Sequence, residues 1–319
     1  MNAKWSSLDK LTADYIAMSG DIEGFGTSEL YVTVASHAAI DGSSLTVREA
    51  FRLFDLGLAV GDRPLNDYLA VADLKEAYIT ADNELARHAE ITPELLCRLN
   101  GTAAARTGHE RIGGGDVWDE RKGEYRTNET AGERGIYDRG GIAAFVDTFC
   151  MQLREAMSQE MTPAERYELS FKAAYNLSSI SPWSLYGNGT ALIAMYMVQR
   201  AGGLIPTAIA PDLKEEYLKS LAISKEYRNI APFVNFMKTA HIKHLKEMTA
   251  VSLAAERKNY LAAAEKTPPA KTDDNQLEGL FAIMPEETIN TDSPKIILAE
   301  DEPIPHDLPK AVDLNEIEF

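Results

Sequence analysis

A glycine-rich turn at residues 187–189 has the clearest chemical content in this sequence. It consists of Gly187-Asn188-Gly189 and leads into residues 190–200, which are apolar nearly all round and predict a buried central helix. Glycine lets backbone N–H groups approach a ligand closely, and the first turn of a helix presents unpaired N–H donors at its positive dipole end. The pattern therefore indicates a phosphate-binding turn, although Gly-Asn-Gly by itself is more often a simple turn.

The residues around this turn extend the pattern. The stretch Ile180-Ser181-Pro182-Trp183-Ser184-Leu185-Tyr186 precedes it, and Arg200-Ala201-Gly202 and Pro206 follow the apolar helix. This arrangement resembles the Fic family, whose motif is His-Pro-Phe-x-Asp/Glu-Gly-Asn-Gly-Arg-x-x-Arg followed by a buried helix. Three more segments agree with the family in order and spacing, so that the resemblance covers roughly residues 30–250: Ala38-Ala39-Ile40-Asp41-Gly42 before Leu45-Thr46-x-x-Glu49, Gly123-Glu124-Tyr125-Arg126, and Tyr217 with Leu221, Phe233 and Phe236.

The resemblance implies a nucleotide transferase that places AMP on a Ser, Thr or Tyr of a target protein. In such enzymes the motif His acts as general base on the target hydroxyl. The acidic residue holds Mg²⁺ on the phosphates, the Gly-Asn-Gly turn cradles them, and the Arg residues neutralise charge on the leaving pyrophosphate.

The sequence departs from the family at nearly every reactive position. Ser181 replaces the family His, and serine is no base near pH 7. Tyr186 replaces the acidic residue and is a poor Mg²⁺ ligand. Thr190 and Ile193 replace the two Arg, and one extra residue separates Pro182 from the turn. Only the cofactor-binding residues Gly187, Asn188 and Gly189 carry over, so loss of base, metal ligand and both cations together leaves little mechanism.

Asp41 is the equivalent of an inhibitory residue that the resemblance implies. In many Fic proteins a Ser/Thr-x-x-x-Glu-Gly/Asn helix places its Glu against the second motif Arg and blocks productive ATP binding. The equivalent here is His37-x-x-x-Asp41-Gly42, and the Arg it would pair with is Ile193. The inhibitory glutamate and the arginine that it would contact are therefore both replaced in this chain.

Other histidines are candidates to replace the missing base or to bind a metal ion. His241 and His244 stand three residues apart on one predicted helix face. No third ligand is suggested, so the favoured interpretation is a solvated basic face, and no metal site is predicted. His109 lies in the long polar segment at 107–141 and is the other candidate to approach the turn.

Three functional hypotheses remain open. The first is a catalytically degenerate Fic-fold protein, more a pseudoenzyme than an enzyme, that binds nucleotide or phosphate at the turn. The second is an active protein adenylyltransferase with diverged chemistry, and the third is a protein-interaction module without nucleotide. The candidate cofactor is ATP or another nucleotide, Mg²⁺ is expected to bind weakly if at all, and a protein partner is expected.

The amino-acid composition disfavours two classes of binding partner. A net charge of −17 disfavours nucleic acid and anionic membranes as partners. Apolar runs of the length of a transmembrane helix are lacking, so the expected localisation is cytoplasmic. Cys97 and Cys150 are too few for a disulfide framework and are expected to be small buried hydrophobic residues.

Helical periodicity dominates the chain and predicts a mainly α fold: a Fic-type helical bundle with a β-hairpin flap and a disordered acidic C-terminal tail. The predicted domains are an N-terminal extension (1–30), the helical domain (31–265) and the tail (266–319), which has 13 acidic residues, 4 Lys and 7 of the 14 Pro. Helix starts are predicted in the Ser44/Thr46 region, at Thr92-Pro93 and at Thr162-Pro163, and long helices at 190–200 and 230–264.

Overall fold

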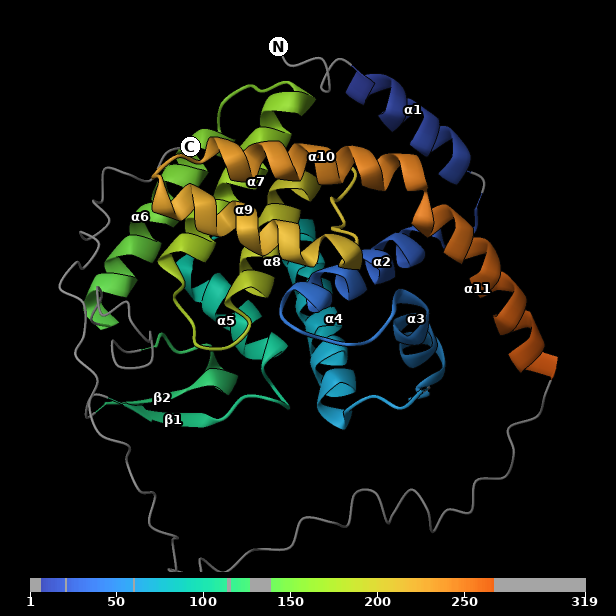
Figure 1. Ribbon diagram of the computed structural model, residues 1–319, viewed down its shortest axis with the longest axis horizontal. Coiled ribbons are helices and arrows are strands. Elements are labelled where there is room, and N and C mark those ends of the chain that lie inside the picture. The colour runs from blue at the N-terminus through green and yellow to red at the C-terminus, as the bar shows by residue number, and fades with distance from the viewer. Residues whose placement is uncertain (1–6, 21, 60, 114–115, 127–138, 267–319) are drawn as a thin grey trace, which may run out of the picture. The chain divides into compact units, whose positions relative to one another are not determined.

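The computed structural model describes residues 7–20, 22–59, 61–113, 116–126 and 139–266 (Figure 1). In chain order the elements are α1 (Leu8–Ser19), α2 (Phe25–Ile40), α3 (Val47–Leu56), α4 (Leu65–Ala86), α5 (Pro93–Ala103), β1 (Glu110–Gly113), β2 (Asp116–Asp119), the 3-10 turn η2 (Glu120–Lys122), α6 (Arg139–Met157), α7 (Pro163–Ile180), α8 (Gly187–Ala201), the 3-10 turn η4 (Pro211–Leu213), α9 (Lys214–Glu226), α10 (Ala231–Glu247) and α11 (Thr249–Lys266). The predicted mainly α fold with a β-hairpin is confirmed, and the predicted acidic tail at 266–319 lies, apart from Lys266, outside the described residues.

Two compact units divide the chain. Of the described residues, the first unit contains those up to 257 and the second contains 258–266, the end of α11. In the first unit, Leu8 and Tyr15 of α1 are buried in the same hydrophobic cluster as residues of α7, α8 and α10. The predicted boundaries near residues 30 and 265 stay predictions.

The N-terminal caps of the helices follow the sequence signals. Thr46 accepts a hydrogen bond from the N–H of Glu49, whose carboxylate accepts from Thr46 N at 2.7 Å. Thr162 and Glu165 form the same reciprocal pair at the start of α7. Thr92 caps α5 with Pro93 at the first helical position. Each arrangement satisfies backbone donors that a helix start leaves unpaired.

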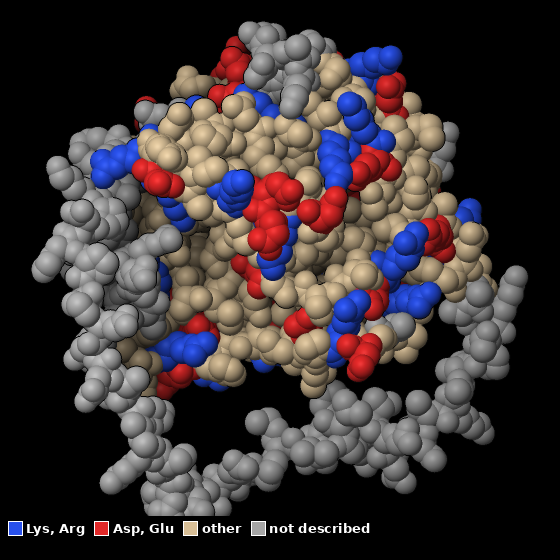
Figure 2. All heavy atoms as spheres, in the orientation of Figure 1, with Lys and Arg blue, Asp and Glu red and all other residues tan. Residues whose placement is uncertain are grey.

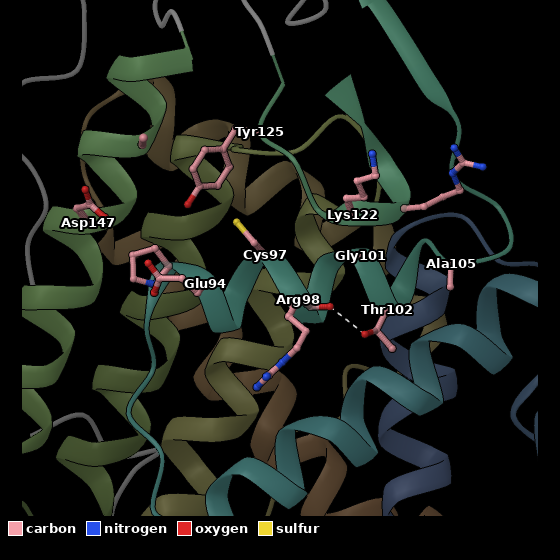
Figure 3. Close-up of a pocket in the computed structure, with 12 residues that line it drawn as sticks. Glu94, Cys97, Arg98, Gly101, Thr102, Ala105, Lys122, Tyr125 and Asp147 are labelled. Atoms are coloured by element: carbon pink, nitrogen blue, oxygen red, sulfur yellow. Dashed lines mark hydrogen bonds between the residues drawn. The ribbon is translucent and has the colours of Figure 1, made fainter. Parts of the chain in front are cut away.

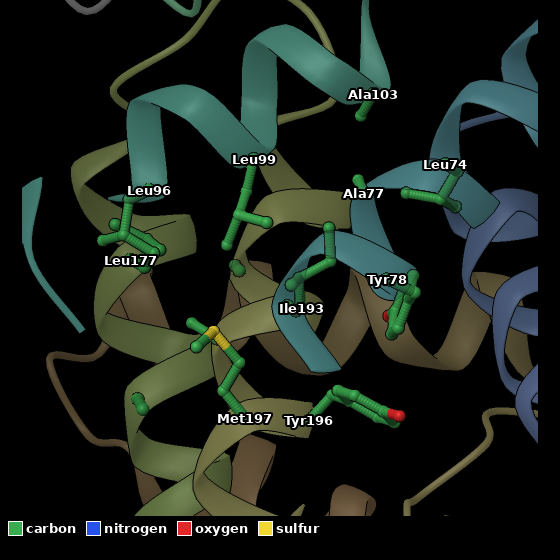
Figure 4. Packing of buried hydrophobic residues seen from close by; sticks show 14 of the residues in the cluster. Leu74, Ala77, Tyr78, Leu96, Leu99, Ala103, Leu177, Ile193, Tyr196 and Met197 are labelled. Atoms are coloured by element: carbon green, nitrogen blue, oxygen red, sulfur yellow. The ribbon is translucent and has the colours of Figure 1, made fainter. Parts of the chain in front are cut away.

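Helix α8 is the centre of the domain. Residues 189–199 are all buried, and α8 packs against α7, α4, α5 and α2. Figure 4 shows Leu96, Leu99 and Ala103 of α5 directed toward Ile193 and Met197 of α8. A helix without a polar stripe is stable only when surrounded, because every exposed face would leave apolar area in water.

A second hydrophobic cluster joins the C-terminal helices to α7 and α8. Tyr217 of α9 and Phe233 of α10 are fully buried there, with ring centroids 5.4 Å apart in an edge-to-face arrangement. Such aromatic pairs add to the stabilisation from apolar burial. This cluster packs α9 against α10.

The hairpin is tied to α5 by close backbone contact. β1 and β2 pair antiparallel, with Glu110 opposite Asp119 and Gly113 opposite Asp116. Gly123, at φ +65°, follows η2 and lies so near α5 that a Cβ would be 1.8 Å from the carbonyl oxygen of Cys97. Any side chain would collide with α5, so this position requires glycine.

Two sequence predictions about helices are wrong. The sequence predicts one helix over residues 230–264, but α10 ends at Glu247, its C-cap Met248 adopts φ +49°, and α11 begins at Thr249. A left-handed residue ends the run of helical hydrogen bonds, and no Gly or Pro signalled this. The helix predicted at 190–200 starts earlier, at Gly187, so that Gly-Asn-Gly forms its first turn.

The face of the described residues shown in Figure 2 has side chains of both charges. On the face in Figure 2, basic and acidic side chains of the described residues mix in small groups, and no broad basic field gathers there. A broad basic field is what nucleic-acid binding needs. None of the described helices combines the length and apolarity needed to cross a membrane.

Candidate anion-binding site at the start of α8

The start of α8 is built on a left-handed residue. Tyr186 is the N-cap at φ +52°, and its carbonyl accepts from Thr190 N at 2.9 Å. Gly187, Asn188 and Gly189 then form the first turn of the helix. A helix start of this kind directs unpaired N–H groups and the positive dipole end toward one point.

The carboxylate of Asp41 occupies this helix start. Its Oδ2 accepts from the N–H of Gly189 at 2.7 Å, although the two residues are 148 positions apart. Asp41 is the C-cap of α2, so the end of α2 is directed at the start of α8. A Cβ on Gly189 would lie 2.5 Å from Oδ2, and glycine is therefore what allows the approach.

The electrostatics of Asp41 combine opposing effects. Burial raises the pKa of its carboxyl to about 6, while hydrogen bonds from Gly189 N and the Asn188 side chain and the charge of Lys214 act to lower it. Lys214 is the first residue of α9. Sequence reasoning missed this cation, because nothing in the sequence indicates that α9 begins beside the turn.

Gly187 faces open space. A Cβ added to it would meet no atom within 4 Å. Among the described residues, the structure assigns no acceptor to the N–H groups of Gly187 and Asn188, whereas Gly189 has Asp41. The first turn of α8 thus has one N–H held by the protein's own carboxylate and an open side at its first glycine.

Ser181 takes part in the site through its backbone. It is the C-cap of α7 at φ +48°, and its carbonyl accepts from Arg126 Nε at 2.5 Å. The backbone N–H of Arg126 donates to the carbonyl of Pro182 at 3.0 Å. The buried guanidinium therefore stabilises the negative end of α7 and holds the loop that leads to α8.

Tyr186 is held as a neutral phenol. Burial raises the pKa of its hydroxyl, which makes a 2.8 Å hydrogen bond with the hydroxyl of Thr107. A neutral phenol is a weak ligand for Mg²⁺, which prefers carboxylate and water oxygens. The residue at the position of the family's metal ligand therefore provides no carboxylate for Mg²⁺.

Thr190 and Ile193 face the interior. The hydroxyl of Thr190 donates to the carbonyl of Tyr186 at 3.0 Å and accepts from Asn100 Nδ2 at 3.0 Å. The Asn100 amide also donates to the carbonyl of Leu185, so α5 fixes both sides of the turn. Ile193 is fully buried. The positions where the motif has arginines therefore have packing and hydrogen-bonding roles in this chain.

Ser184 connects the same loop to the hairpin. Its hydroxyl donates to Glu120 Oε1 at 2.7 Å and accepts from Trp118 Nε1 at 3.1 Å. Glu120 is itself held by Arg111 Nε at 3.0 Å and by the N–H of His109 at 3.0 Å. His109 thus lies directly before β1 and participates through its backbone.

Three other histidines, His37, His241 and His244, are buried in the core. His241 and His244 are 0% and 6% exposed, so the predicted solvated basic face is wrong. Thr207 links two of these histidines. His37 Nε2 donates to the Thr207 carbonyl at 2.9 Å, and His241 Nδ1 lies 2.9 Å from the Thr207 hydroxyl. His37 also bonds the Tyr78 hydroxyl. Burial lowers the pKa of His37 and His244 to about 4 and holds that of His241 well below its usual value, so all three are neutral near pH 7.

Comparison with known proteins identifies the fold. No family model and no curated protein sequence matches this chain. A Fic domain containing signaling protein from Bacteroides thetaiotaomicron superposes with a TM-score of 0.62 at 19% identity, over 78% of this chain and 98% of that one. Fic-1 from C. elegans gives 0.58 at 14% identity, over 77% of this chain and 73% of that one. The chain has the Fic fold.

A third solved structure agrees. A Fic family protein from Desulfovibrio desulfuricans gives a TM-score of 0.56 at 13% identity, over 79% of this chain and 76% of that one. At such identities the similarity establishes the fold, and function must be argued from the residues of the site.

Proposed function

We propose that this chain is a Fic-fold binding protein without transfer activity, and that the start of α8 is a phosphate-binding site regulated by its own Asp41. The observation that carries the proposal is the 2.7 Å hydrogen bond from Gly189 N to Asp41 Oδ2. A carboxylate shares its charge and its acceptor oxygens with a phosphate, and helix starts favour both. Asp41 therefore acts as an internal competitor for the ligand.

The groups around the turn suit a phosphate-bearing ligand such as a nucleotide. Gly187 leaves space for a phosphate to approach the first N–H groups of α8. Lys214 is near enough to influence the pKa of Asp41, and it would provide positive charge in place of the arginines that Thr190 and Ile193 replace. Neighbouring cations and helix N–H groups commonly bind phosphates together.

Three side chains of the motif support the proposed lack of transfer activity. Ser181 is no base near pH 7, and its carbonyl is bound to Arg126. Tyr186 is a neutral phenol bonded to Thr107, and Thr190 is bonded to Asn100. Incubation of the chain and candidate target proteins with labelled ATP and Mg²⁺ or Mn²⁺ should leave all proteins unlabelled. Labelled protein would support the alternative of an active adenylyltransferase.

Calorimetry with ATP, ADP and AMP tests the binding site. Asp41→Ala removes the competitor and should tighten nucleotide binding by about 10-fold or more, because a hydrogen bond to a charged group contributes roughly 1.5–3 kcal/mol. Gly187→Val fills the open side of the turn and should abolish binding, while Gly187→Ala serves as the matched smaller substitution. If Asp41→Ala binds no nucleotide at millimolar concentration, the phosphate site is refuted.

A protein-interaction module without nucleotide is the second candidate. The observation that favours it is the same contact, because Asp41, Asn100 and Arg126 already satisfy much of the turn and its loop. In that case Asp41 serves as a permanent cap, and neither the wild type nor Asp41→Ala binds nucleotide.

A further inference from the structure

A phosphate at the start of α8 would displace the Asp41 carboxylate from the N–H of Gly189. The displaced carboxylate loses that donor, and leaving a charged acceptor unsatisfied inside a protein is costly. The donors that surround Asp41 therefore decide how easily a phosphate takes its place.

The cavity beside α5 provides no such donor. It has a volume of about 780 Å³ and is lined mainly by α5, η2 and α6 (Figure 3). The lining includes no described residue of α2, α8 or α9. Three cations line it, and each is already paired with a carboxylate: Arg98 with Glu84, and Arg121 and Lys122 with Asp119.

Tyr217 of α9 has a hydroxyl without a hydrogen-bond partner. Helices α2 and α9 pack against each other, and Ile40, next to Asp41 in sequence, shares a hydrophobic cluster with Tyr217. Tyr217 is fully buried, and among the described residues nothing accepts from or donates to its hydroxyl. Buried tyrosine hydroxyls usually have a partner. Tyr78, whose pKa is raised by burial and also by the charge of Asp41, already bonds His37.

Ser178, in the last turn of α7, has a second hydroxyl of this kind. The residue is 4% exposed, and its hydroxyl has no partner among the described residues. Its carbonyl, by contrast, accepts from Lys225 Nζ at 2.8 Å. A helical serine commonly bonds back to a carbonyl of the preceding turn, as Ser170 does to Tyr167 at 2.7 Å. The Ser178 hydroxyl makes no such bond and remains available to an acceptor outside its own helix.

The two hydroxyls lie close to each other and within the influence of Asp41. Burial raises the pKa of the Tyr217 phenol, the Ser178 hydroxyl acts to lower it, and the charge of Asp41 raises it further. Lys214 precedes Tyr217 by three residues on α9, so both lie on one face of that helix. The charge of Lys214 acts in turn on Asp41. This face of α9 therefore presents a cation and a free phenol toward the carboxylate.

We propose that Tyr217 and Ser178 donate to the Asp41 carboxylate once a phosphate has displaced it from Gly189. The carboxylate then has a closed position, on Gly189 N, and an open position, on the two hydroxyls. Both hydroxyls are unsatisfied in the closed position and satisfied in the open one, which offsets the bond lost from Gly189. This inference rests on the phosphate site proposed above. It makes Tyr217 a positioning residue, which acts on the ligand through Asp41.

Calorimetric titration of the full chain with pyrophosphate tests the open position. Tyr217→Phe should weaken binding by about 10-fold or more, because the displaced carboxylate loses one hydrogen bond to a charged group. Ser178→Ala should weaken binding in the same direction. In the Asp41→Ala background the effect of Tyr217→Phe should fall below about 2-fold, since no carboxylate is left to receive.

Tyr15→Phe is the matched control. Tyr15 is 1% exposed, and its hydroxyl also has no partner among the described residues, but it lies on α1. This variant should leave the affinity for pyrophosphate unchanged. Tyr217→Phe should also keep the urea midpoint of the ligand-free chain, because the hydroxyl that it removes forms no bond there. A lower midpoint in Tyr217→Phe would show that the hydroxyl is already bonded, and it would overturn the inference.

The remaining outcomes separate this inference from the proposed function. If Asp41→Ala binds no pyrophosphate, the phosphate site itself is refuted. If Asp41→Ala binds and the wild type does not, the carboxylate never leaves Gly189 and the open position is refuted alone. Binding to both proteins with unchanged affinity in Tyr217→Phe refutes it as well. A loss in Tyr217→Phe that persists without Asp41 would show that Tyr217 acts on the ligand by another route.

Discussion

Replacing Gly189 by alanine should reveal the contact with Asp41 through stability. An added Cβ at Gly189 lies 2.5 Å from Asp41 Oδ2, whereas one at Gly187 meets nothing within 4 Å. Both glycines are in the first turn of α8 and neither has a positive φ. The pair therefore compares the same substitution with and without displacement of Asp41.

The expected changes in the free energy of unfolding follow from two effects. Gly→Ala in a compatible helical conformation stabilises a protein by about 0.4–1 kcal/mol, mainly by restricting the unfolded chain. At Gly189 the displaced carboxylate also loses a hydrogen bond, at a cost of roughly 1.5–3 kcal/mol. Gly187→Ala should therefore be more stable than wild type, and Gly189→Ala less stable by about 1–2 kcal/mol.

Urea denaturation measures both variants, with unchanged m-values required for the comparison. In the Asp41→Ala background the difference between the two alanine variants should fall below about 0.5 kcal/mol, since the partner is gone. If Gly189→Ala is as stable as Gly187→Ala while Asp41 is present, the contact does not exist in solution and the reasoning fails.

Three further predictions concern the surrounding framework. His37 and His244 should stay neutral down to about pH 4, because burial lowers their pKa. The unfolded chain takes up protons on these histidines first, already near about pH 6.5. The free energy of unfolding should therefore fall as the pH drops from about 6.5 toward 4. NMR titration of the imidazoles checks this, and ordinary titration near 6.5 would contradict it. Gly123→Ala should destabilise the protein by roughly 2 kcal/mol or more in urea denaturation. The control Gly57→Ala, also at φ +65° but facing open space, should cost about 1–2 kcal/mol. Equal losses of stability in the two variants would contradict the close approach of Gly123 to α5. Arg126→Met should cost about 2–4 kcal/mol by the same method, because the carbonyls at the end of α7 lose their buried donor; a loss below 0.5 kcal/mol would show that another group satisfies them.

Local signals in the sequence were sufficient to predict much of the fold. The caps at Thr46, Thr92 and Thr162 depend on residues within three positions of each other, and all three are confirmed. The β-hairpin was likewise expected in the polar segment that contains it. The apolar character of α8 indicated a surrounded helix, which its neighbours confirm.

The site was less predictable because its contacts are distant in sequence. Asp41 reaches Gly189 across 148 positions and Asn100 reaches Thr190 across 90. Asp41 was identified through the resemblance alone, as the equivalent of a residue that contacts an arginine. That arginine is Ile193 here, and the structure gives the carboxylate a different partner, a backbone N–H.

The buried histidines show the same limit. The spacing of His241 and His244 is that of one helix face, but spacing does not tell whether the face points to water or to the core. That depends on Thr207 and Tyr167, which come from other elements and surround His241. Polar residues inside a core are determined by such partners rather than by local pattern.

The most direct test of the regulated phosphate site is the backbone amide NMR signal of Gly189 during titration with pyrophosphate. If pyrophosphate replaces the Asp41 carboxylate, the signal shifts in the wild type and shifts at about 10-fold lower concentration or less in Asp41→Ala. A Gly189 signal that does not move in either protein would contradict the claim that the start of α8 binds phosphate in competition with Asp41.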